Sequence, residues 1–168
     1  AVSFYSLGFG YSAELCIACN DPGFRAQQKK RTFLAKQVQT FKLGSHILRD
    51  APYFEITYKG KRRKVLDVTV ASGDIFGGYY RLPARLSKKG FFFEISDDKS
   101  FLGTVRTAAE LMTNRYSGGE VINSVSFTLH QPVAAHIGGE GFTAPAPCTV
   151  EIGHYPKPIR LIATSTKA

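Results

Sequence analysis

The stretch Tyr-Phe-Glu-Ile-Thr-Tyr-Lys-Gly-Lys-Arg-Arg-Lys-Val-Leu-Asp-Val-Thr-Val-Ala, residues 53–71, decides the fold. Its two ends, residues 53–58 and 65–71, are rich in aromatic and β-branched side chains, which favour strands. Five basic residues surround a single glycine between these ends, at residues 59–64. The pattern predicts a β-hairpin with a strongly basic tip.

Two helices are predicted on either side of this hairpin. Over residues 24–43, Leu34, Val38 and Phe41 recur at helical spacing and share one face, and Gly44 is expected to end the helix. A second helix is predicted over about 101–116. Residues 12–19 fit either a short helix or a buried strand. Further strands are expected at 79–82, 91–95, 121–129, 148–152 and 159–163.

These elements predict an α+β fold: a single domain with a mostly antiparallel sheet of about six to eight short strands and two helices. Residues 1–23 are expected to form an aromatic, glycine-rich N-terminal arm, residues 24–163 the α+β domain, and residues 164–168 a polar tail. Residues 130–147 hold three glycines and three prolines, which is typical of a long binding loop.

The positive charge of the chain is concentrated in one stretch. The formal net charge is +9, and residues 25–64 carry twelve Lys and Arg against two acids. So local an excess indicates an anionic partner, and aromatic side chains of the arm are expected to join the contact. The predicted partner-binding residues are Arg25, Lys29, Lys30, Arg31, Lys36, Lys59, Lys61, Arg62, Arg63, Lys64, Phe4, Tyr5, Phe9 and Tyr11.

Two short patterns have the form of chemical motifs. Gly8–Ala13 matches the G-x-G-x-x-A form of a dinucleotide loop, but no acidic residue follows where a ribose would need one. Cys16 and Cys19 have the spacing of half a zinc site or a redox pair, but the chain offers no regular second half. The cysteines are therefore only weak cofactor-binding candidates, and buried, unreactive thiols are expected. No cofactor, metal site or catalytic residue is predicted.

The prediction for function is a non-enzymatic structural or assembly subunit of a larger complex. Its basic helix and hairpin tip would dock on acidic protein surfaces. An alternative is an RNA- or DNA-binding protein that uses the same basic face, although no RNA- or DNA-binding signature is present.

A second alternative comes from residues 101–129, in which a predicted helix, Gly118-Gly119-Glu120-Val121-Ile122 and a strand follow one another. This order resembles the end of the small linker domain of phycobilisome linker polypeptides. The resemblance implies a non-enzymatic linker in a light-harvesting assembly.

The expected location is an intracellular, reducing compartment, either cytoplasm, an organelle interior or an assembled particle. The chain has only three cysteines, and a low, odd number argues against a secreted disulfide framework. No signal peptide is visible. No apolar run reaches the roughly 18 residues that a bilayer-spanning helix needs, so no membrane span is predicted.

Overall fold

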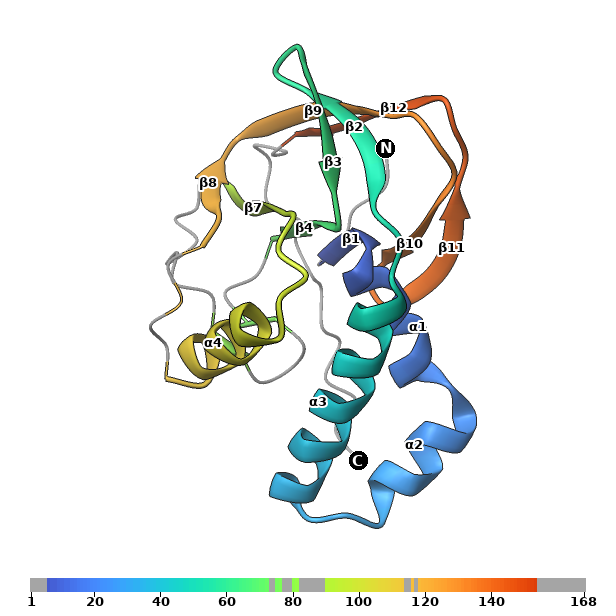
Figure 1. Ribbon diagram of the computed structural model, residues 1–168, viewed down its shortest axis with the longest axis vertical. Helices are drawn as coiled ribbons and strands as arrows, with labels where there is room; N and C mark the ends of the chain where they lie inside the picture. The colour runs from blue at the N-terminus through green and yellow to red at the C-terminus, as the bar shows by residue number, and fades with distance from the viewer. Residues whose placement is uncertain are drawn as a thin grey trace, which may run out of the picture.

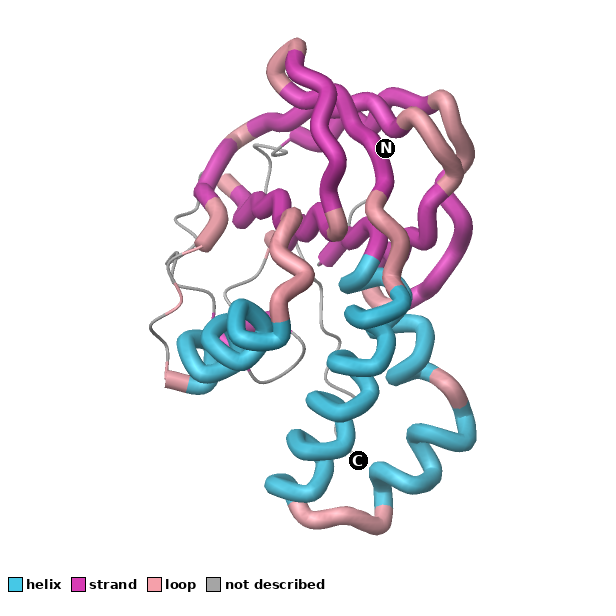
Figure 2. Tube along the Cα trace, in the orientation of Figure 1, coloured by secondary structure: helices cyan, strands magenta, loops and turns pink. Residues whose placement is uncertain are grey.

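The computed structural model describes residues 6–72, 75–76, 80–81, 90–113, 116 and 118–153 (Figure 1). Two antiparallel sheets lie face to face at one end, and helices extend from the larger sheet toward the other end (Figure 2). The predicted α+β class with mostly antiparallel strands is confirmed.

The strands fall into two principal sheets and a small pair. The six-stranded sheet has the order β11-β10-β1-β4-β7-β8, and the four-stranded sheet has the order β12-β9-β2-β3. Strands β5 (Ile75–Phe76) and β6 (Tyr80–Arg81) form the pair, and β6 lies within the predicted strand 79–82. The other bounds are β1 Ser6–Gly10, β2 Phe54–Tyr58, β3 Lys61–Val65, β4 Asp67–Ala71, β7 Phe91–Ser96, β8 Glu120–Ile122, β9 Ser124–Leu129, β10 Val133–Ile137, β11 Glu140–Ala144 and β12 Cys148–Gly153.

The described residues form four helices, α1 (Tyr11–Asn20), α2 (Pro22–Lys29), α3 (Phe33–Asp50) and α4 (Phe101–Met112). The predicted single helix 24–43 is wrong: it is two helices, because the Thr32 side chain accepts a hydrogen bond from the backbone N–H of Ala35 and starts a new helix. Helix α3 also continues past Gly44. The second predicted helix, 101–116, is present and ends earlier, at Met112.

Gly44 does not end α3 because it is a packing position. A Cβ atom at this residue would lie 2.8 Å from the hydroxyl of Tyr11 in α1. The missing side chain therefore allows α1 and α3 to approach each other closely.

The predicted hairpin over 53–71 is only partly correct. Strands β2 and β3 do form a hairpin, but the basic residues 61–64 lie along β3 itself and the turn is Lys59-Gly60. After Leu66 the chain crosses to the other sheet, where residues 67–71 form β4. Strand β3 is an edge strand, and exposed charges are well tolerated on a sheet edge.

The predicted long loop over 130–147 is also wrong. Strands β10 and β11 form a hairpin there, and Gly138 and Gly139 supply the two positive φ angles, 59° and 100°, of its two-residue turn. The predicted strand 121–129 divides into β8 and β9, which belong to different sheets.

The N-terminal segment is not an arm over the residues that the structure describes. Strand β1 pairs with both β10 and β4 in the middle of the larger sheet, and α1 follows it directly. Leu7 and Phe9 are buried there because their side chains point into the core. Residues 1–5, with Phe4 and Tyr5, the predicted strand 159–163 and the tail 164–168 lie outside the described residues.

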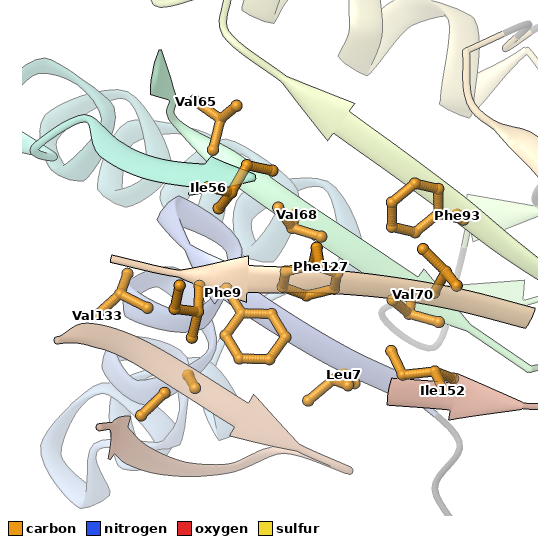
Figure 3. Close-up of a cluster of buried hydrophobic side chains, with 14 of the residues drawn as sticks. Leu7, Phe9, Ile56, Val65, Val68, Val70, Phe93, Phe127, Val133 and Ile152 are labelled. Atoms are coloured by element: carbon orange, nitrogen blue, oxygen red, sulfur yellow. The ribbon is translucent and has the colours of Figure 1, made fainter. Parts of the chain in front are cut away.

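The hydrophobic core lies between the two sheets (Figure 3). Alternate residues of β1, β4 and β7 point into it from the larger sheet, and residues of β2, β9 and β12 point into it from the smaller one. Phe9 and Phe127 meet edge to face at its centre, with ring centroids 5.4 Å apart. This contact joins one sheet to the other.

Replacing Phe127 with alanine is expected to destabilise the protein by about 3 to 5 kcal/mol, because the ring is 1% exposed and its loss leaves a cavity between the sheets. Urea unfolding followed by circular dichroism measures the change. Phe142→Ala is the matched control: this ring is 41% exposed, and its loss is expected to cost only about 1 kcal/mol. Equal losses for the two variants would contradict this description of the core.

Candidate functional site

A row of polar positions crosses the outer face of the six-stranded sheet. The strand register aligns His136 of β10 with Gly8 of β1, Gly8 with Thr69 of β4, and Thr69 with Glu94 of β7. Asp67 lies two residues before Thr69 and therefore on the same face. The opposite face of these strands is the apolar core, whereas the polar row shares its own face with Phe92, which packs against Tyr116.

Asp67 connects this polar face to helix α1. Its Oδ1 atom accepts a hydrogen bond of 2.6 Å from the backbone N–H of Ser12, and its Oδ2 atom accepts one of 2.7 Å from the hydroxyl of Thr69. The carboxylate thus satisfies a free N–H group in the first turn of the helix. Burial raises the pKa of Asp67 to about 6, although both hydrogen bonds act in the opposite direction.

His136 and Gly8 form the next part of the polar face. A Cβ atom at Gly8 would lie 2.6 Å from His136 Nε2 and would also overlap the Ser12 hydroxyl, so the imidazole occupies the space left by the glycine. His136 is buried, and its Nδ1 atom has no hydrogen-bond partner among the described residues. Burial lowers the pKa of this imidazole.

Glu94 and Tyr116 form the part of the polar face nearest the other sheet edge. The Tyr116 hydroxyl donates a hydrogen bond to Glu94 Oε1. Burial raises the pKa of Glu94, and burial together with this carboxylate raises the pKa of Tyr116. Glu94 is only partly buried, whereas Asp67 is buried, with 9% exposure, so Glu94 is the more accessible carboxylate.

Desolvation is the largest cause of the pKa shift at each of these four titratable groups. Such shifts cluster at functional sites, because a carboxyl group that titrates near neutral pH can hold or release a proton under physiological conditions. We define the polar face as Gly8, Ser12, Asp67, Thr69, Glu94, Tyr116 and His136.

The weak motif Gly8–Ala13 does occupy a strand–turn–helix junction, as a dinucleotide loop would. However, the carboxylate of Asp67 already accepts a hydrogen bond from the backbone N–H of Ser12, and the sheet around the junction is antiparallel. An anionic pyrophosphate would meet this carboxylate at the helix terminus. The geometry therefore disfavours a dinucleotide here.

Cys16 and Cys19 lie in α1, and Cys148 lies in β12 of the four-stranded sheet. The Cys16 thiol donates a weak hydrogen bond of 3.6 Å to the carbonyl oxygen of Gly139, and burial raises the pKa of both Cys16 and Cys19. A raised pKa disfavours the reactive thiolate. Among the residues that the structure describes, no three metal-ligating side chains come together.

The predicted basic face is divided between two ends of the molecule. The turn between α2 and α3 lies at one end of the long axis, and the turn between β2 and β3 lies at the other (Figure 1). Arg25, Lys29, Lys30 and Arg31 are exposed near the first turn, with Lys36 half-buried. The basic residues exposed near the second turn are Lys59, Lys61, Arg62, Arg63 and Lys64.

Two of the predicted aromatic contact residues have structural roles instead. Phe9 is 2% exposed in the core. Tyr11 starts α1 and packs against Leu48 and Leu66, and burial raises its pKa to about 12.

The sequence reasoning missed the polar face. One signal was present: Asp67 interrupts the apolar run Val65–Val70, and an acid inside such a strand indicates a buried carboxylate with partners. The row of Thr69, Glu94 and His136 depends on strand pairing between distant segments, so no local sequence pattern predicts it.

The chain matches no protein-family model and no curated protein sequence. Among solved structures it is similar to a diacylglycerol kinase from Bacillus anthracis strain Sterne, with 14% identity and a TM-score of 0.50 over 89% of this chain and 50% of that one. Another structure from the same organism, also described as a diacylglycerol kinase, has 13% identity, a TM-score of 0.50 and the same coverage. The chain thus spans about half the length of these neighbours, and the likeness establishes a shared fold.

These neighbours overturn the prediction of a non-enzymatic structural or assembly subunit. The two neighbours that share this fold are described as diacylglycerol kinases, and not as linker polypeptides or nucleic-acid-binding proteins. The expectation that the chain has no enzymatic role, and the phycobilisome-linker alternative, are corrected on the same finding.

Replacing Asp67 with asparagine is expected to remove a pH dependence of stability. Because the folded-state pKa of Asp67, about 6, exceeds the ordinary aspartate value of 3.8, the folded state binds more protons than the unfolded state between these values, and stability falls as pH rises through this window. The two pKa values correspond to a decrease of about 3 kcal/mol for the wild type. Urea unfolding between pH 4 and pH 7 measures it, and parallel curves for the two proteins would contradict the assignment.

Proposed function

We propose that this chain forms half of a lipid phosphotransferase of the diacylglycerol kinase type. The observation that carries the proposal is the fold match to two such structures over 89% of the chain. In the proposed reaction, the hydroxyl oxygen of the acceptor lipid forms a bond to the γ-phosphorus of a nucleoside triphosphate. The bond from that phosphorus to the bridging oxygen breaks, and the hydroxyl proton is released.

The chain offers groups for the acceptor side of this reaction. Phosphoryl transfer depends mainly on positioning and electrostatic stabilisation. Glu94 is a partly exposed carboxylate whose Oε1 atom accepts a hydrogen bond from the Tyr116 hydroxyl, and we assign its Oε2 atom the role of orienting a lipid hydroxyl. The sequence contains no glycine-rich loop followed by Lys and Ser or Thr. We therefore assign the nucleotide to the half of the neighbours that this chain does not span.

The test is transfer of labelled γ-phosphate from Mg-ATP to diacylglycerol in mixed micelles, by the protein purified from its host with every segment and subunit that accompanies it. Labelled phosphatidic acid is the expected product. Glu94→Gln keeps the shape of the side chain and removes its charge, and it is expected to lower kcat/KM by about ten- to hundredfold through lost positioning.

Glu151→Gln is the matched control, because Glu151 is exposed on β12 of the other sheet, away from the polar face. Its kcat/KM is expected to equal that of the wild type. Absence of any labelled lipid product would overturn the proposed function. Product formation with equal rates for Glu94→Gln and wild type would instead overturn the role of Glu94.

A further inference from the structure

The hairpin formed by α2 and α3 is strongly basic. Residues 22–49 contain seven Lys and Arg and no Asp or Glu. Three of these bases, Lys29, Lys30 and Arg31, are consecutive and exposed at the turn between the two helices. This turn projects away from both principal sheets (Figure 2).

Exposed apolar side chains adjoin these bases. At the start of α3, Phe33 is 60% exposed and Leu34 is 68% exposed, and Val38 one turn further on is 48% exposed. Leu34 and Val38 share a face of the helix because they are four residues apart. We call Lys29, Lys30, Arg31, Phe33, Leu34 and Val38 the helical tip.

We propose that the helical tip docks this protein on the surface of a bilayer that contains anionic phospholipids. Bases beside exposed aromatic and aliphatic side chains are typical of helices that lie in the membrane interface. The Lys and Arg side chains meet lipid phosphates, while the exposed side chains of Leu34 and Val38 enter the headgroup layer.

The exposed apolar segment is short. Phe33 and Val38 are five positions apart, which is about 7.5 Å along the helix axis and far less than the roughly 30 Å of a hydrocarbon core. No helix among the described residues is long and apolar enough to cross a membrane.

A bilayer fits the helical tip better than a protein or a nucleic acid does. Lysine is depleted at protein–protein interfaces, and the tip contains two adjacent lysines. Nucleic-acid bases stack on aromatic and guanidinium planes, and Arg31 and Phe33 are the only such groups of the tip, whereas the aliphatic Leu34 and Val38 suit the apolar part of a bilayer interface.

The biological meaning of this docking surface rests on the proposed function, because an enzyme that phosphorylates a diacylglycerol must reach a membrane. Its test does not depend on activity. The full chain is sedimented with vesicles of phosphatidylcholine, with or without roughly one-third phosphatidylserine, and neither ATP nor diacylglycerol is present. Binding is expected only to vesicles with phosphatidylserine, and high salt is expected to weaken it.

Charge reversal tests the basic part of the tip. The triple variant Lys29→Glu, Lys30→Glu and Arg31→Glu is expected to weaken vesicle binding by at least about 100-fold, since each nearby base contributes a factor of about five. The matched control reverses three exposed bases at the opposite end of the molecule: Lys61→Glu, Arg63→Glu and Lys64→Glu. It changes the net charge equally and is expected to retain most of the binding.

Removal of an apolar side chain tests the inserted part. Leu34→Ser is expected to weaken binding by about tenfold. Leu102→Ser is its control, because Leu102 is a 78% exposed leucine on α4. Thermal unfolding of every variant verifies the fold, which surface substitutions of this kind are expected to leave intact.

Three results would overturn the inference. They are no binding of the wild type to phosphatidylserine vesicles at low salt, equal losses in the two triple variants, and equal losses in the two leucine variants. The first would assign the tip to a protein partner or to another part of the enzyme. Vesicle binding without phosphoryl transfer would overturn the proposed function and leave the docking surface in place.

Discussion

The burial of β4 on both of its faces is the constraint on which the rest of the structure depends. All five of its residues are buried, although two of them, Asp67 and Thr69, are polar. Val68 and Val70 alternate with them and fill the core. Polar side chains on a strand without solvent must find partners, and the N-terminus of α1 supplies one. The position of the first helix therefore follows from the alternation in one strand.

The local patterns predicted the class of the fold because they depend on short-range physics. The strands predicted over 91–95 and 148–152 are present in the structure, and the helix predicted over about 101–116 is present over Phe101–Met112. The failures arose where tertiary contacts override local signals. Gly44 looked like a helix end but allows close packing with Tyr11, and residues 65–71 left the hairpin because their side chains are buried on both faces.

The candidate site was less predictable than the fold, for a physical reason. Thr69 and Glu94 are 25 positions apart in sequence, and His136 is farther still, yet cross-strand register places them in one row. The most visible feature of the sequence is the local excess of Lys and Arg, so the predicted site consisted mainly of basic residues. It could not distinguish bases at one end of the molecule from bases at the other, and that division separates the edge strand β3 from the helical tip.

Helix α1 connects the polar face to the helical tip. Its first turn is held by the carboxylate of Asp67, and its last turn leads directly into α2. The close approach of Tyr11 to Gly44 fixes the angle between α1 and α3, and Leu48 packs against Leu66 at the sheet. Since α3 begins in the helical tip and ends against the sheet, the tip cannot turn freely relative to Glu94. Docking the tip on a bilayer would therefore set the orientation of the polar face toward the lipid that it is proposed to receive.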